Sequence, residues 1–162
     1  QIAETFGMQV LVCTPHEKPL DGLHSTRFAD ADTVLANSDI ITCHCPLTPD
    51  TQGMMNAAAF DKMKDGVVLL NFSRDTLVNE DDIKVALESG KVAKYVVDFP
   101  NPTTVKLLNT TVTPHLGAST EESEDNCARM AVKEIRDFLE NGNIQQSVKF
   151  VISWKMVTSK IL

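Results

Sequence analysis

The hydrophobic residues of this chain fall into short runs that alternate with stretches of helical spacing. Five runs are rich in β-branched side chains, and turn-forming residues bound each of them. Strands that are this continuously apolar are typical of a parallel sheet covered by helices on both faces. The predicted strands are residues 8–12, 39–43, 67–71, 92–97 and 110–113.

The segments of helical spacing have recognisable ends. Asn79 precedes three acidic residues and is predicted to cap a helix that stops at Ser89-Gly90. Ser119 and Glu122 fit a capping box for the longest helix, which Asn141-Gly142 is predicted to close. Its apolar residues recur at helical spacing. The predicted helices are residues 1–6, 57–63, 80–88 and 119–141.

This alternation predicts an α/β fold, a doubly wound parallel sheet of the Rossmann type. The chain opens in a predicted helix that ends at Gly7 and is followed directly by a strand. A doubly wound sheet begins with a strand, so we expect the domain to be incomplete at its N-terminus, without its first strand and glycine loop. We expect residues 1–142 to form this domain, and residues 143–162 to be a connection towards a second domain or a disordered tail.

Composition narrows the class of protein. Hydrophobic residues make up 43% of the 162 positions and charged residues 23%, as in a soluble globular domain. The net charge of −7 argues against nucleic-acid and anionic membrane partners, which need clustered Lys and Arg. No apolar run approaches the roughly 18 residues of a membrane span.

The four cysteines predict packing rather than metal chemistry. Cys13, Cys43, Cys45 and Cys127 have no His or Cys partner at metal-ligand spacing, so no metal site is expected. The first three lie in apolar runs and are expected in the core, which favours a reducing cytoplasm as the compartment. His44 is expected either in the core or in the wall of the cofactor site, with the core favoured, and His16 and His24 are expected in solvent.

Ligands of an open parallel sheet bind beyond the carboxyl ends of its strands, and polar loops follow every predicted strand there. Arg74, Asp98 and His115 are therefore expected to converge on one crevice. A guanidinium can grip a carboxylate, and a histidine can exchange a hydroxyl proton near neutral pH. Hydride removal would need a cofactor. The alternative from local sequence alone is a surface ion pair for Arg74 and a turn role for His115.

Several motifs resemble the D-2-hydroxyacid dehydrogenase family in order and spacing. They are CPLTPDT at residues 45–51, MKDG at 63–66, NFSR at 71–74, VNE at 78–80, LESGK at 87–91 and TPHLGAST at 113–120. Within the family the chain is most similar to the phosphoglycerate dehydrogenases, through RDTLV at residues 74–78 and DFP at 98–100.

The resemblance implies a role for each matching residue. Arg74 binds the substrate carboxylate and polarises its carbonyl, His115 is the general acid and base, and Asp98 holds the nicotinamide carboxamide. Further cofactor contacts fall on Pro46, Phe72, Ser73, Gly117 and Ala118. The implied reaction is NAD-dependent oxidation of 3-phospho-D-glycerate to 3-phosphohydroxypyruvate, the first step of serine synthesis, in a homodimer or homotetramer.

Three departures from the family pattern bear on this reading. The glycine loop that binds the pyrophosphate is absent. Thr14 stands where the family has an acid for the adenosine ribose, with His16 and Lys18 nearby, so NADP is not excluded. The segment from Pro100 to Thr103 lacks the glutamate that pairs with the histidine, and Glu121, Glu122 and Glu124, which could replace it, are better explained as the start of a helix.

Two alternative functions follow from these observations. The first is another enzyme of the family, such as a glyoxylate, hydroxypyruvate or lactate reductase. The second is a non-catalytic protein of the same fold that senses NAD(H) and joins a partner, as the family's transcriptional corepressors do. The missing glutamate favours this second alternative, and the retained Arg74 and His115 count against it.

Overall fold

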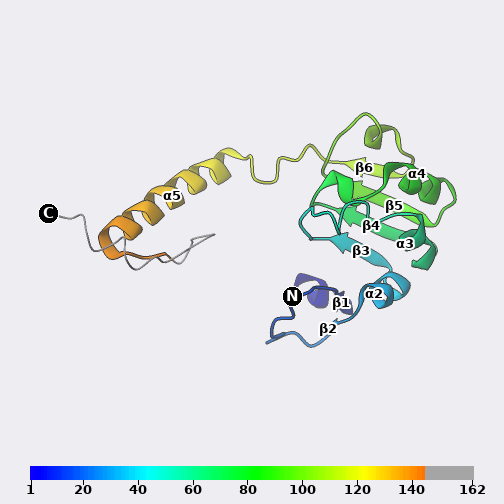
Figure 1. The fold of residues 1–162 in the computed structure, drawn as a ribbon, viewed down its shortest axis with the longest axis horizontal. Helices are drawn as coiled ribbons and strands as arrows, with labels where there is room; N and C mark the ends of the chain where they lie inside the picture. The colour runs from blue at the N-terminus through cyan, green and yellow to red at the C-terminus, as the bar shows by residue number, and fades with distance from the viewer. Residues whose placement is uncertain (145–162) are drawn as a thin grey trace. The chain divides into compact units, whose positions relative to one another are not determined.

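A computed structural model describes residues 1–144 of the chain, which form two compact units. The first unit ends at His115 and the second begins at Leu116. The first contains all the strands of the described residues, and the long helix α5 (Glu121–Asn141) belongs to the second (Figure 1). No helix among the described residues is long and apolar enough to cross a membrane. The predicted connection or tail at residues 143–162 lies outside the described residues beyond Ile144.

The strands of the first unit form two sheets, both parallel. The larger contains β3 (Ile40–Cys43), β4 (Val67–Asn71), β5 (Val92–Val97) and β6 (Thr110–Val112), in that order. The smaller pairs β1 (Val10–Val12) with β2 (Thr26–Phe28). These elements agree with the predicted fold class and with all five predicted strands.

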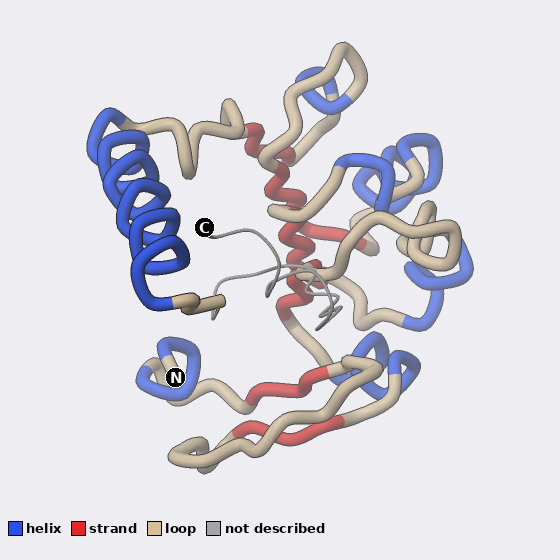
Figure 2. Tube along the Cα trace, turned by 60° about the vertical axis from the view of Figure 1, so that its left-hand side comes forward, coloured by secondary structure: helices blue, strands red, loops and turns tan. Residues whose placement is uncertain are grey.

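The strand order explains why there are two sheets. In the doubly wound order 3-2-1-4-5-6, β2 and β1 correspond to places 3 and 2, and β3, β4 and β5 to places 4, 5 and 6, while β6 extends the sheet by one strand beyond β5. Place 1, between β1 and β3, has no strand among the described residues. The topology therefore agrees with the prediction of a sheet that lacks its first strand. Figure 2 shows the β1–β2 pair apart from the larger sheet.

Sequence reasoning missed two elements between β1 and β3. They are β2 and α2 (Ala31–Asn37). β2 has only three residues and an exposed arginine at its centre, so it has no hydrophobic run. Asp30 caps α2 by accepting a hydrogen bond from the Thr33 amide at 2.8 Å, a signal that the sequence did contain.

The core lies on one face of the larger sheet, under α3 (Ala57–Lys62) and α4 (Glu80–Glu88). Alternate strand residues are buried there, as a period of two requires. The buried strand residues are Ile41, Cys43, Val67, Leu69, Asn71, Val92, Tyr95 and Val97. The opposite face is open in the first unit, where Ile40 is 47% exposed and Lys94 is also exposed. The expectation that several strands have no exposed face holds for β4, whose residues are buried or partly buried, and is wrong for β3 and β5.

The helix ends follow local capping rules with one correction. Asn79 caps α4, and its Oδ1 accepts from the amides of Asp81 and Asp82 at 3.1 Å each, as predicted. The N-cap of α5 is Thr120, which accepts from the Ser123 amide, so the capping box predicted from Ser119 is wrong by one residue. Gly142 ends α5 in the left-handed conformation, at φ 67°, as predicted. The helix α1 (Ile2–Thr5) and two short 3₁₀ turns, η1 (Asp75–Leu77) and η2 (Thr104–Lys106), complete the fold.

In the second unit, taken by itself, no residue of α5 is buried, and its apolar side chains, among them Met130, Ile135 and Phe138, are exposed. One prediction of burial is not met. Cys13 is exposed rather than in the core, because it follows a strand of the smaller sheet, whose three residues are only partly buried. Cys43 is buried and Cys45 is half-buried, and all four cysteines are free.

Candidate active site

The candidate site lies at the carboxyl edge of the larger sheet. All four strands run parallel, so the loops that leave their carboxyl ends meet at this edge. The residues that follow β4, β5 and β6 include Arg74, Asp98 and His115, respectively. The loop with Thr14 follows β1 and therefore belongs to the smaller sheet.

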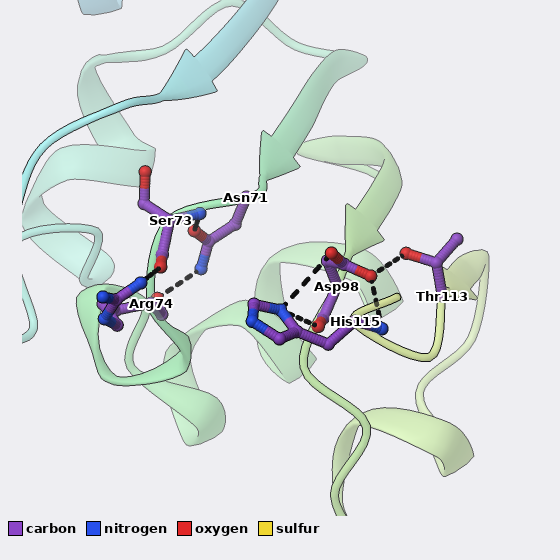
Figure 3. Close-up of polar contacts among 6 residues, drawn as sticks. All are labelled: Asn71, Ser73, Arg74, Asp98, Thr113 and His115. Carbon is purple, nitrogen blue, oxygen red and sulfur yellow. Dashed lines mark hydrogen bonds and ion pairs between the residues drawn. The ribbon is translucent and has the colours of Figure 1, made fainter. Parts of the chain in front are cut away.

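The structure brings Asp98 and His115 into direct contact (Figure 3). Asp98 Oδ1 accepts a hydrogen bond from the His115 main-chain amide at 2.7 Å and one from Thr113 Oγ1 at 2.5 Å. The imidazole Nδ1 lies 3.1 Å from the Asp98 main-chain oxygen and 3.4 Å from Asp98 Oδ2. Register explains the contact, because Val97, one position before Asp98, pairs with Val112, three positions before His115.

The surroundings of the pair are partly apolar. The Phe99 ring packs on the imidazole with 4.8 Å between the ring centroids. The Asp98 side chain is 17% exposed and that of His115 is 57% exposed, so the imidazole remains accessible to a ligand. The hydrogen bond from Thr113 and that from the His115 amide, together with the nearby imidazole, lower the pKa of Asp98 below its ordinary value. Asp98 is therefore an anion at neutral pH.

His115 also has an unusual main-chain conformation. Its φ is +55°, in the left-handed region that residues other than glycine seldom adopt. Such conformations persist where surrounding contacts hold them, and they concentrate at functional sites. Here the hydrogen bond from the His115 amide to Asp98 supplies such a contact.

A buried amide organises the loop that carries Arg74. The Asn71 side chain donates to the Arg74 main-chain oxygen at 2.8 Å and accepts from the Ser73 amide at 3.2 Å. Ser73 Oγ donates to the Cys43 main-chain oxygen at 2.7 Å, which ties the loop to β3. Sequence reasoning missed both Asn71 and Thr113 as supporting residues. The available signal was a single amide ending an otherwise apolar strand at residues 67–71.

Arg74 lies on the loop after β4, and its convergence with Asp98 and His115 on one crevice stays a prediction. Its Nη1 donates to the Ser73 main-chain oxygen at 2.5 Å, so the guanidinium folds back on its own loop (Figure 3). The side chain is exposed, and among the described residues no hydrogen bond or ion pair joins it to Asp98 or His115. The acceptor of this hydrogen bond, the Ser73 oxygen, belongs to the residue next to Arg74. The partner predicted for the guanidinium is the carboxylate of a substrate.

The remaining predicted cofactor residues differ in their surroundings. Phe72 is 45% exposed at the end of β4, and the Pro46 oxygen accepts from Thr51 Oγ1 at 2.7 Å. Thr14 Oγ1 contacts the main chain of His16 at 3.4 Å, and His16 is exposed as predicted. Gly117 and Ala118 belong to the second unit and are described separately from the others.

Three further expectations concern His44, the segment around Asn101, and His24. His44 is exposed and its Nε2 lies 2.9 Å from Thr42 Oγ1, so the favoured expectation that it lies in the core is wrong. It falls on the open face, which the prediction assumed to be covered. In the segment that lacks the family's glutamate, the Asn101 side-chain amide donates to Glu80 Oε1 at 2.7 Å. His24 is exposed, as predicted.

Surface pockets in the first unit lie away from this pair. One is lined by Gln52 and Gly53 together with Asp75, Thr76 and the start of α4. Another lies along β1 and β2. Neither is lined by Arg74, Asp98 or His115.

Residues 1–117 match the family model described as D-isomer specific 2-hydroxyacid dehydrogenase, NAD binding domain. The chain belongs to this family. The match agrees with the predicted NAD cofactor, and a D-2-hydroxyacid dehydrogenase from Lactobacillus delbrueckii, solved in its NAD complexed form, aligns with a TM-score of 0.77 and 25% identity. It covers 88% of this chain and 49% of that one.

The names of the relatives refer to different substrates. A hydroxypyruvate reductase of Blautia hydrogenotrophica is 36% identical over 89% of this chain and 47% of its own length. A D-3-phosphoglycerate dehydrogenase of Bacillus subtilis is 34% identical over 99% of this chain and 32% of its own length. A glyoxylate reductase from Paecilomyes thermophila has a TM-score of 0.76 and 28% identity, covering 88% and 45% of the two chains. The chain thus spans less than half the length of these proteins.

Proposed function

We propose that this chain supplies the cofactor-binding part of an NAD-dependent enzyme that oxidises 3-phospho-D-glycerate to 3-phosphohydroxypyruvate, the first step of serine synthesis. The observation that carries the proposal is the contact of His115 with the Asp98 anion at the sheet edge where Arg74 also lies. Family membership supports the reaction class. The RDTLV segment and the relatives named D-3-phosphoglycerate dehydrogenase support the substrate.

The residues at the sheet edge fit a nicotinamide. Phe72 offers a half-exposed aromatic ring for a planar group, and Pro46 lies on the neighbouring loop. Asp98 Oδ2 lies 3.4 Å from His115 Nδ1 and can still accept a hydrogen bond from a carboxamide N–H. Ser73, Gly117 and Ala118 are the further cofactor contacts proposed from the family pattern. When bound, NAD supplies the acceptor for the hydride.

The chain's own residues account for the proton and the carboxylate. His115 Nε2 takes the proton of the substrate hydroxyl as the carbon-bound hydrogen leaves with its electron pair, and a carbonyl forms. Asp98 holds the resulting imidazolium. Arg74 releases the Ser73 oxygen and forms two parallel hydrogen bonds with the substrate carboxylate, which is a stronger, charge-assisted acceptor. In the reverse reaction His115 returns the proton.

Thr14 is the proposed contact of the adenosine ribose. A hydroxyl cannot accept two ribose hydrogen bonds as a carboxylate does, so discrimination against NADP is expected to be weak. His16 and Lys18 are exposed on the same loop and carry the positive charge that a ribose phosphate needs. Titration of the chain with NADH and NADPH in parallel tests this point, and strong rejection of NADPH would contradict it.

The test of the proposed function is a comparison of substrates in the full-length gene product that contains this sequence. We expect faster turnover of 3-phosphoglycerate than of glycerate or lactate, measured by the absorbance of the NADH that forms. His115→Gln is expected to abolish turnover, and Arg74→Lys to raise KM for the acid and lower kcat, because a lysine cannot form the bidentate pair. Full activity of a His115 variant would refute the proposal that the protein is this enzyme.

A second candidate is a reductase of unphosphorylated 2-oxo acids. The hydroxypyruvate reductase and D-lactate dehydrogenase relatives favour it. Preference for hydroxypyruvate or pyruvate over the phosphorylated acid in the same assay would identify it. The absence of a glutamate from the segment around Asn101 favours, more weakly, an NAD(H)-sensing protein without turnover, which an intact function after His115→Gln would indicate.

We propose the cytoplasm as the compartment and a homodimer or homotetramer as the assembly. The four free cysteines suit a reducing compartment. Exposed apolar side chains on α5, among them Met130, Ile135 and Phe138, suit burial against another surface. Light scattering of the purified gene product measures the assembly directly.

A further inference from the structure

One nitrogen of the His115 imidazole, Nδ1, lies close to two hydrogen-bond acceptors. The Asp98 main-chain oxygen lies 3.1 Å from Nδ1 and Asp98 Oδ2 lies 3.4 Å from it. Neither a carbonyl oxygen nor an ionised carboxylate has a hydrogen to give. Nδ1 must therefore carry the hydrogen, and in the neutral ring the lone pair is then on Nε2.

The contacts around the ring hold this orientation. Asp98 Oδ1 accepts from the His115 amide and from Thr113 Oγ1, which fixes the carboxylate relative to the main chain of His115. Phe99 packs on the imidazole at 4.8 Å between centroids. Asp98 is the ionised group that the end of β5 presents to the ring, and no described residue makes a hydrogen bond to Nε2.

We propose that Asp98 is a positioning residue for His115, holding the neutral imidazole in the Nδ1–H form with Nε2 free for the proton. The proposal rests on the function proposed above for His115. It assigns to Asp98 the partner role for which the segment around Asn101 offers no acid. The same carboxylate then stabilises the imidazolium that forms when the substrate hydroxyl gives up its proton.

The first experiment determines which imidazole nitrogen carries the hydrogen. Two-bond ¹H–¹⁵N spectra of the chain at about pH 9, well above the ordinary histidine pKa of about 6.5, distinguish a protonated from an unprotonated ring nitrogen. The chain has four histidines, and the signals lost in His115→Gln assign this one. We expect Nδ1 to be protonated in His115. A free imidazole prefers the Nε2–H form, so that form in His115 would overturn the proposal.

The second experiment changes the partner without changing its shape. Asp98→Asn can direct an amide N–H at Nδ1, which then has to accept, so we expect the ring to shift towards the Nε2–H form. Asp98→Glu keeps a carboxylate and is expected to retain the Nδ1–H form. Asp75→Asn is the control, because Asp75 Oδ1 accepts from the adjacent Thr76 amide rather than from His115. An unchanged ring in Asp98→Asn would overturn the proposal.

A third measurement does not depend on a variant of Asp98. The side-chain carboxyl ¹³C signal of Asp98 reports its own titration, and in His115→Gln the contribution of the imidazolium is lost. The pKa of Asp98 is then expected to rise towards its ordinary value while the Thr113 hydrogen bond keeps part of the depression. No change would argue against a charge coupling between the two side chains.

Activity of the full-length gene product separates this proposal from the proposed function. An Asp→Asn exchange beside the histidine of a Ser-His-Asp triad selects the wrong ring form and lowers kcat by about 10⁴. We expect Asp98→Asn to lower kcat by about 10²–10⁴ by the same cause, with less effect on KM for the acid. If His115→Gln is inactive but Asp98→Asn keeps full kcat, the role of Asp98 fails alone. If His115→Gln is active, the proposed function fails, and the NMR result still decides the ring form.

Discussion

The side-chain amide of Asn71 donates a hydrogen bond to the main-chain oxygen of Arg74 at 2.8 Å, and Asn71 has no exposed surface. The same amide group accepts from the Ser73 main-chain N–H, so one buried side chain holds both ends of the turn after β4. The turn is what places Arg74 at the carboxyl edge of the sheet. A polar residue is retained in the core at this point because the turn has main-chain groups that need a partner.

Replacement of Asn71 tests this role. Asn71→Leu keeps the approximate volume but leaves the Arg74 oxygen and the Ser73 amide without their partner. We expect the free energy of unfolding to fall by about 1–3 kcal/mol, measured by urea denaturation followed by circular dichroism. Asn37→Ala is the matched control, since this exposed amide donates to the Thr33 oxygen within α2, and we expect a change within about 0.5 kcal/mol. Equal stability of Asn71→Leu and wild type would contradict the role.

The phenol of Tyr95 provides a pH-dependent prediction. Burial raises the pKa of Tyr95 to about 12, with a smaller opposing effect of its hydrogen bond with Asn71. The folded state therefore holds the phenol proton more tightly than the unfolded state, and stability falls as pH rises from about 10 towards 12. Tyr95 is the only tyrosine of the chain, so phenolate absorbance reports on it alone. Titration near pH 10 with the fold intact would be the contrary result.

The four thiols are expected to differ in reactivity. Burial, and to a lesser extent the neighbouring Cys45, raise the pKa of Cys43 to about 12. Cys13 and Cys127 are exposed. We expect a thiol reagent at neutral pH to modify Cys13 and Cys127 first, and Cys43 only when the chain unfolds, because the thiolate is the reacting form. Peptide mass spectrometry after timed labelling identifies the sites, and fast labelling of Cys43 would contradict the buried position.

The cap of α4 gives a prediction of local stability. Asn79→Ala removes the acceptor for the Asp81 and Asp82 amides and is expected to lower the free energy of unfolding by about 1 kcal/mol. Asn79→Ser retains an acceptor and is expected to recover most of the loss. Denaturation of both variants beside wild type makes the comparison, and equal losses in the two would show that the cap is not the cause.

The elements of the structure show which features of the fold can be predicted from local sequence. The strands β3, β4 and β5, the helix α4 and its cap at Asn79, and the end of α5 at Gly142 were all predicted from the sequence. Each depends on side-chain periodicity or on contacts within a few residues. The short strand β2 was missed for the same reason, because its residues form a strand only by pairing with β1.

The sequence by itself determined that Arg74, Asp98 and His115 follow successive strands and so reach one edge of a parallel sheet. Only the tertiary structure decided which of them meet. Asp98 and His115 are 17 residues apart, and the pairing of β5 with β6 is what brings the imidazole onto the carboxylate. Arg74 instead satisfies its guanidinium on the adjacent Ser73 oxygen. A side chain's partner is set by the register and by the acceptors within reach, and neither can be read from the order of residues along the chain.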